Sequence, residues 1–92
     1  MEKCVRAVVS GQVQGVFFRA FTQEEAERLQ VSGWVRNRPG GEVEALICGP
    51  APRVDEMVEW LGTGSPQSRV DKVAVAEISR PDQPLAGFTI RS

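Results

Sequence analysis

The sequence of 92 residues contains no histidine and no tyrosine. Histidine is the most frequent general base near neutral pH, so its absence excludes Ser-His and Cys-His nucleophilic pairs and His-ligated metal sites. Positive charge is not in excess either, because 11 Lys and Arg oppose 12 Asp and Glu and leave a net charge of −1. This balance argues against a bulk electrostatic attraction to nucleic acid or to an anionic membrane. Basic residues with a function must therefore act locally.

Long hydrophobic runs are also missing. No run approaches the roughly 18 residues of a membrane span, and the first 30 residues lack the charged, apolar and small-residue order of a secretory signal. We therefore expect a cytoplasmic protein with no membrane partner. The length and the 41% hydrophobic content are typical of one domain, residues 1–92, with one core. The small size and balanced charge favour a monomer.

Hydrophobic periodicity predicts the element order β-α-β-β-α-β with a short extra strand at the end. The predicted strands cover residues 3–9, 34–38, 42–48, 70–78 and 87–91, and the predicted helices cover residues 18–31 and about 54–61. Ser10-Gly11 is expected to stop the first strand. Two helices on one face of a mostly antiparallel sheet make a ferredoxin-like α+β sandwich.

The start of the first helix has two interpretations. Thr22 with Glu25 matches a capping box, which would begin the helix late. An apolar stripe at near-helical spacing instead indicates a start at Phe18 and is continuous, so we prefer it. Gly33 is expected to end this helix, and Gly62 and Gly64 are expected to end the second. The stripe consists of Phe18, Phe21, Ala26 and Leu29.

The segment between the first strand and the first helix, residues 10–19 (SGQVQGVFFR), is the most unusual part of the chain. Successive backbone N–H groups in such a turn, together with the positive end of a helix dipole, can bind an anion. Arg19 would add a planar, permanently charged guanidinium to the same anion. The alternative is a simple tight turn, and the loop pattern alone does not exclude it.

Asn37 is the second candidate residue. The first and second strands of a split βαβ arrangement are parallel, so their carboxyl ends share one edge of the sheet, which brings Asn37 near Arg19. Asn37 also shares a face of its strand with Val35. If Val35 faces the core, Asn37 is a polar amide at the rim and needs a partner. An asparagine that bonds its own turn before Pro39 is the alternative, and spacing leaves both open.

Two segments resemble the signature segments of the acylphosphatase family: residues 11–19 (GQVQGVFFR) and residues 33–44 (GWVRNRPGGEVE). Residues 64–72 (GSPQSRVDK) are similar to a later segment of that family. The family has a similar length and a ferredoxin-like sandwich. The resemblance implies hydrolysis of the carboxyl-phosphate bond of acyl phosphates without metal or cofactor, with inorganic phosphate or sulfate as competing anions.

The resemblance also assigns residue roles. Arg19 would bind the phosphoryl group, and Asn37 would orient the attacking water. Gln12 departs from the family pattern, in which this position is often basic. The leaving group is a carboxylate, so no general acid is needed, which agrees with the absence of histidine. The phosphate cradle would consist of Gln14, Gly15, Val16, Phe17, Phe18 and Arg19.

Two other function classes share parts of this pattern. The RNA-recognition motif has the same element order, but it needs exposed aromatic residues on its first and third strands, and residues 3–9 and 42–48 contain none. We therefore expect no nucleic-acid partner. A regulatory domain could instead bind an anion in the cradle without catalysis. The acidic residues show no spacing typical of divalent-metal ligands.

The two cysteines, Cys4 and Cys48, begin the first predicted strand and end the third. These strands are adjacent and antiparallel in the predicted topology, so the two sulfurs could lie side by side and form a disulfide. The preferred interpretation is two buried free thiols in a reducing cytoplasm. Nucleophilic cysteine chemistry is not expected, because no histidine can activate a thiol.

Overall fold

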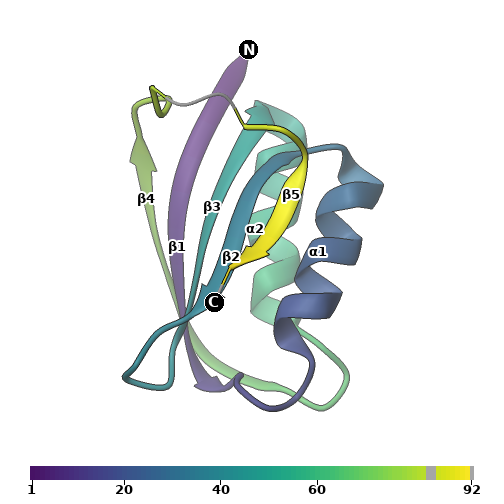
Figure 1. Cartoon of the computed structure of the whole chain (residues 1–92), viewed down its shortest axis with the longest axis vertical. Coiled ribbons are helices and arrows are strands. Elements are labelled where there is room, and N and C mark those ends of the chain that lie inside the picture. Colours follow the sequence, from purple (N-terminus) through teal and green to yellow (C-terminus); the bar gives the residue numbers. More distant parts are fainter. Residues whose placement is uncertain (83–84, 92) are drawn as a thin grey trace.

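The computed structural model describes residues 1–82 and 85–91. One five-stranded sheet runs in the order β4-β1-β3-β2-β5, and two helices cover one of its faces (Figure 1). This arrangement confirms the predicted ferredoxin-like sandwich. The strands are β1 (Glu2–Gln12), β2 (Ser32–Asn37), β3 (Val43–Pro50), β4 (Arg69–Ile78) and β5 (Phe88–Arg91), and the helices are α1 (Phe18–Leu29) and α2 (Ala51–Thr63).

Strand directions bring two chain segments to one edge of the sheet. β3 is antiparallel to both β1 and β2, so β1 and β2 run in the same direction. The loop that follows β1 and the last residue of β2 therefore meet at one end of the sheet. β5 pairs in parallel with β2, with Ile90 opposite Val35, and this pairing adds the C-terminal strand to the same neighbourhood.

The core lies between the sheet and the two helices. Alternation along β1 directs Val5, Ala7 and Val9 inward, and all three are buried. The inward-facing residues of β3 and the apolar stripe of α2 complete this layer. Its largest fully buried hydrophobic side chains are Phe18, Ile47, Met57, Leu61, Val5, Val9, Val13, Val35, Val43 and Val54. Within the described residues, neither helix is long and apolar enough to cross a membrane.

Three glycines play different roles from those expected. β1 does not stop at Ser10-Gly11, because Gly11, with φ 128°, takes up a shift in register against β4 and the strand continues to Gln12. Gly33 does not end α1; it lies within β2, close to the backbone of Leu46. α1 ends instead at Leu29, and its C-cap residue Gln30 has the left-handed conformation. α2 passes through Gly62 and ends before Gly64.

The orientation of α1 differs from the predicted stripe at one position. The helix starts at Phe18, which confirms the earlier of the two starts. Thr22 is fully buried, and its Oγ1 donates a 2.7 Å hydrogen bond to the carbonyl of Phe18, which satisfies the hydroxyl inside the core. Phe21 was expected on the buried face, but 37% of its surface is exposed. Thr22 therefore occupies the inward position, and Phe21 faces solvent.

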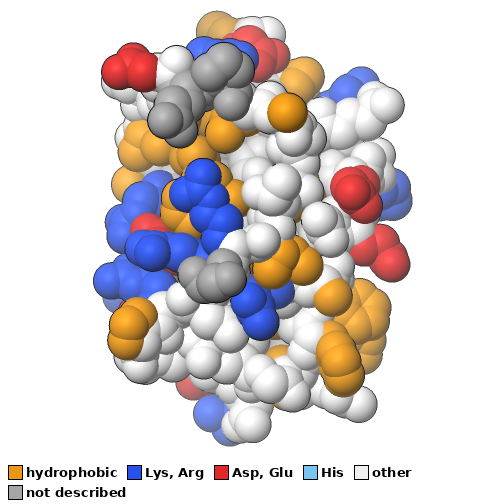
Figure 2. All heavy atoms as spheres, in the orientation of Figure 1, with side chains coloured by type: hydrophobic (Ala, Val, Ile, Leu, Met, Phe, Trp, Pro, Cys, Tyr) orange, Lys and Arg blue, Asp and Glu red, His pale blue; other side chains and the backbone are white. Residues whose placement is uncertain are grey.

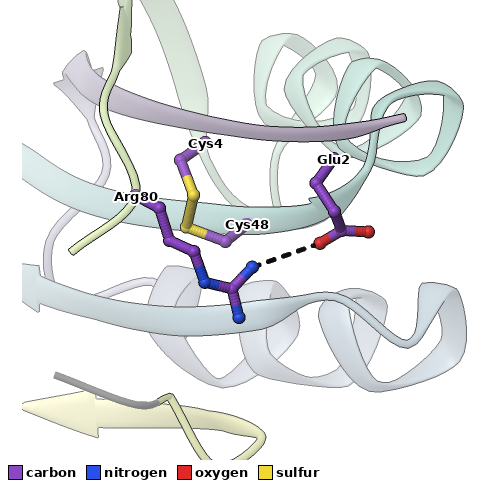
Figure 3. Close-up of a disulfide and its surroundings, with 4 residues drawn as sticks. All are labelled: Glu2, Cys4, Cys48 and Arg80. Atoms are coloured by element: carbon purple, nitrogen blue, oxygen red, sulfur yellow. Dashed lines mark hydrogen bonds and ion pairs between the residues drawn. A yellow bond between two sulfur atoms is a disulfide. The ribbon is translucent and has the colours of Figure 1, made fainter. Parts of the chain in front are cut away.

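A disulfide joins Cys4 and Cys48 on the sheet face opposite the helices (Figure 3). The two residues are directly paired across β1 and β3, with their Cα atoms 4.2 Å apart. This bond corrects the expectation of two free thiols. Trp34, Ile78 and Leu85 pack against it and form a small second apolar cluster.

An ion-pair network lies on the same sheet face, opposite the helices. Figure 2 shows Lys and Arg side chains gathered over the strands with an acidic side chain among them. Glu44, whose side chain is only 4% exposed, accepts a hydrogen bond from Nε of Arg36 at 2.6 Å and another from Nε of Arg6. Burial alone raises the pKa of Glu44, but the two arginines outweigh it and hold that pKa below its usual value.

Candidate active site

A cavity of about 310 Å³ opens where the N-terminus of α1 meets the ends of β2 and β5. The topology predicted that Arg19 and Asn37 would be neighbours, and both line this cavity. Its walls combine a few polar groups with a larger apolar part, which is usual for a small-molecule site. The lining residues are Val13, Gly15, Phe17, Phe18, Arg19, Ala20, Asn37 and Ile90.

The loop from Val13 to Phe17 forms the floor of the cavity. Gly15 has φ 76° and Phe17 has φ 61°, so two left-handed residues turn the chain tightly into α1. Nothing lies within 4 Å of a Cβ placed on Gly15, so the backbone conformation, and not space, favours glycine there. A positive φ is uncommon for a bulky residue such as phenylalanine and marks a constrained segment.

The backbone N–H groups of this loop are available to a ligand. Among the described residues, no N–H from Gln14 to Phe17 donates to a backbone carbonyl. The start of α1 carries no side-chain cap and no acidic residue in its first turn. The first N–H groups of a helix have no partner within the helix, and the dipole favours negative charge there. The segment can therefore bind an anion.

Two hydrogen-bonded anchors fix the loop. Nε2 of Gln14 donates to the carbonyls of Arg38 and Glu42, each at 2.9 Å, and so ties the loop to the turn between β2 and β3. Oγ of Ser65 donates to the carbonyl of Val16 at 2.9 Å and ties it to the segment after α2. The side chains of Gln14 and Val16 do not line the cavity, unlike the other predicted cradle residues.

Arg19 lies in the first turn of α1 and is held from one side. Its Nη1 donates a 3.2 Å hydrogen bond to the carbonyl of Arg91 in β5. The other guanidinium N–H groups have no acceptor among residues 1–82 and 85–91. One N–H group of the Arg19 guanidinium is thus held by the backbone, while the others can bind an anion in the cavity.

Asn37 is the last residue of β2 and pairs with Val43. Val35 is fully buried, as the alternation required, and so Asn37 points to the same side at the rim of the core. Oδ1 of Asn37 is buried and has no hydrogen-bond partner in the described part of the chain. A buried acceptor without a partner is costly and rare in native proteins. This oxygen does not bond its own turn, so the turn interpretation has no support.

Three lining residues were not identified from the sequence: Val13, Ala20 and Ile90. Val13 lies within the unusual segment of residues 10–19 but directly before the predicted cradle, and Ala20 directly follows the cradle. Ile90 has no local signal, because it reaches the cavity only through the parallel pairing of β5 with β2.

Comparisons with known proteins identify the family of this chain. The family model described as Acylphosphatase matches residues 5–90. An acylphosphatase of Rubrobacter xylanophilus is 60% identical over 75 residues, which are 82% of this chain and 68% of that protein. The crystal structure of the Bacillus subtilis acylphosphatase superposes with a TM-score of 0.92 at 41% identity and covers 100% of both chains. The acylphosphatase structure from Coxiella burnetii gives a TM-score of 0.91 at 42% identity, over 98% of this chain and 93% of that one. This chain therefore belongs to the acylphosphatase family.

Proposed function

We propose that the chain hydrolyses the carboxyl-phosphate bond of acyl phosphates by in-line attack of a water that Asn37 orients on a phosphoryl group held by Arg19 and the loop amides. The reaction class follows from the family, which makes the chain a hydrolase that acts on acyl phosphates. The residue roles rest on the arrangement of the cavity. Inorganic phosphate and sulfate, which match the phosphoryl group in shape and charge, act as competing anions.

Binding of the phosphoryl group is assigned to the start of α1. The amides of residues 14–19 and the helix dipole supply fixed partial positive charge, and Arg19 supplies a full charge. In the transition state, negative charge spreads over the equatorial oxygens of the phosphoryl group. Donors that are already in place stabilise that charge without reorganisation, which is the largest contribution that such a site can make.

The role assigned to Asn37 is to orient the attacking water. Its amide has no proton equilibrium near neutral pH and cannot act as a base. The side-chain amide of Asn37, a residue that lines the cavity, can instead accept a hydrogen bond from water or donate one to it and hold the water oxygen toward phosphorus. The water oxygen forms a bond to phosphorus while the phosphorus-acyl oxygen bond breaks. The bonding electrons leave with the carboxylate, and a phosphoryl oxygen of the substrate takes the proton from water.

The lack of a general acid fits this leaving group. A carboxylate is stable as an anion near neutral pH, so it departs without a proton, and a chain with no histidine can catalyse the step. Positioning and charge stabilisation then supply the rate enhancement. A phosphate monoester of an alcohol has a far more basic leaving group and is not expected to react at a comparable rate.

The observation that carries the proposal is the meeting of Arg19 and Asn37 at one cavity. The test is phosphate release by the purified, metal-stripped chain from benzoyl phosphate, with phenyl phosphate as the matched monoester. We expect rapid hydrolysis of benzoyl phosphate only. If neither is hydrolysed while inorganic phosphate still binds, the chain is an anion-binding domain and the proposal fails.

A further inference from the structure

Exposed apolar side chains gather around the mouth of the cavity. Large hydrophobic residues on a protein surface are normally scattered and need no explanation, whereas a contiguous group marks a binding surface. Three of the exposed large hydrophobic residues belong to the cavity or to the hollows beside it: Phe17, Phe21 and Ile90, which are 69%, 37% and 40% exposed. In Figure 2, hydrophobic side chains protrude where Figure 1 draws the N-terminal half of α1.

Phe17 lines both the cavity and the hollows beside it. Its side chain lines the phosphate cavity and also two shallow hollows, of about 210 Å³ and 150 Å³, on the outer side of α1. Phe21 lines both hollows, Val16 and Pro66 close the larger one, and Ala20 lies in the smaller. The left-handed backbone of Phe17 holds a large ring at the surface of a constrained loop, where it adds nothing to the core.

The fold gives no reason for this apolar strip. Phe17, Ala20 and Phe21 recur at helical spacing on the side of α1 that faces solvent. The opposite side of the helix already supplies its core contacts through Phe18 and Thr22, both fully or almost fully buried. A surface position in a helix ordinarily favours a polar residue.

From this placement we infer that Phe17, Phe21 and Ile90, with Ala20, form the subsite for the acyl group of the substrate. The inference rests on the proposed function, because the acyl group is bonded to the phosphoryl group in the cradle and must lie just outside it. In-line attack directs the leaving group away from the water, and so away from Asn37 at the end of β2. The outer side of α1 offers apolar surface beside the cavity, on a different element from the one that carries Asn37.

The charge of the subsite narrows the substrate class. Glu24 lines the smaller hollow together with Phe17, Ala20 and Phe21. A carboxylate at this rim repels a second carboxylate on the acyl group, whereas the aromatic rings favour an apolar one. The site therefore selects uncharged aromatic or branched aliphatic acyl phosphates over acetyl phosphate and over dicarboxylic acyl phosphates such as succinyl phosphate.

The first test compares kcat/KM for benzoyl and acetyl phosphate in the wild type and in Phe21→Ala. The ratio of the two values should fall by about 3- to 10-fold in the variant, the effect of losing one aromatic contact. Val75→Ala is the matched control, since Val75 is also an exposed hydrophobic residue, 45% exposed, but lies on β4 away from the cavity. This control should keep the wild-type ratio. An unchanged ratio in Phe21→Ala would overturn the subsite.

The second test needs no turnover. Benzylphosphonate and methylphosphonate are inert and differ only in the group beside phosphorus, so calorimetry measures the subsite directly. The wild type should bind benzylphosphonate more tightly, and Phe21→Ala should lose most of that preference. Equal binding of the two by the wild type would refute the subsite even in an active enzyme. A wild type that prefers benzylphosphonate but hydrolyses no acyl phosphate would instead refute the proposed function.

A third test concerns the charge of Glu24 at the rim of the smaller hollow. Glu24→Gln should raise kcat/KM for succinyl phosphate relative to acetyl phosphate, because the repulsion between two carboxylates is removed. An effect that disappears in 1 M salt would agree with a surface charge interaction. No change in this ratio at low salt would overturn the exclusion of dicarboxylic acyl groups.

Discussion

The guanidinium of Arg19 is hydrogen-bonded to the backbone carbonyl of Arg91, at 3.2 Å, across the junction between α1 and the edge strand β5. A backbone acceptor is fixed by the sheet, since β5 is paired with β2 along its length. The charge of Arg19 is therefore held in place before a ligand arrives. Preorganised charge of this kind is what phosphoryl transfer requires.

Arg19→Gln should lower kcat for benzoyl phosphate by about 10² to 10³, the scale of losing one preorganised donor in the transition state. It should also weaken inhibition by inorganic phosphate. Arg53→Gln is a suitable control, because Arg53 lies on α2 and bonds only Gln30 among the described residues. Near-normal hydrolysis by Arg19→Gln would remove this residue from the mechanism.

Asn37→Ala should separate catalysis from binding. Its proposed role is to place water, so kcat should fall by about 10², the loss expected for one positioned group, while the inhibition constant of inorganic phosphate stays close to that of the wild type. Steady-state kinetics with phosphate as a competitive inhibitor measure both quantities. A parallel loss of phosphate affinity and turnover would show that Asn37 holds the phosphoryl group and not the water.

Periodicity and strand order were sufficient to predict the neighbourhood of Arg19 and Asn37, because parallel β1 and β2 must end at the same edge. The exposure of Phe21 could not be predicted in this way. Phe21 and Thr22 are adjacent on the helix, and a period of 3.6 residues does not decide which of them faces the core when the hydroxyl of Thr22 can bond within the helix. Because Thr22 faces inward, Phe21 is left to line the two hollows beside the cavity.

Long-range pairing explains the other omissions. Ile90 joins the cavity because β5 adds to the β2 edge, and a four-residue strand carries no signal for the edge that it selects. For the cysteines, the sequence predicts the position of the two sulfurs but not their oxidation state. Their pairing across β1 and β3 follows from the topology, but whether adjacent thiols are oxidised depends on chemistry that the pattern does not contain.

Reduction of the Cys4–Cys48 disulfide should destabilise the chain. The cysteines are 44 residues apart, and closing a loop of that length reduces the entropy of the unfolded chain by an amount worth about 4 kcal/mol. Urea unfolding with and without a reductant measures the difference, and thiol counting on the unfolded protein without reductant should find no free thiol. A Cys4→Ala/Cys48→Ala variant should unfold at the same urea concentration in both conditions. Two free thiols in the wild type would contradict the bond.

Glu44 should make stability depend on pH in the acid range. The hydrogen bonds from Arg36 and Arg6 outweigh burial and hold the folded-state pKa of Glu44 below its unfolded value of about 4.3. The unfolded chain therefore binds the proton more readily, so Glu44 contributes stability above pH of about 4.3 and loses it as the pH falls through the folded-state pKa. The free energy of unfolding should fall on acidification in the wild type and fall less steeply in Glu44→Gln.

Glu25→Gln offers the comparison for that measurement. The hydrogen bond from Arg28 also lowers the pKa of Glu25, so the sign of its effect is the same. The side chains of Glu25 and Arg28 are 17% and 60% exposed, however, whereas those of Glu44 and Arg36 are 4% and 46% exposed, and water and salt weaken the more exposed pair. Urea unfolding between about pH 3 and pH 6 should therefore show a larger loss of pH dependence in Glu44→Gln than in Glu25→Gln, and the difference should increase as salt is added. Equal slopes in both variants would mean that burial between two arginines gives Glu44 no greater role than the more exposed Glu25.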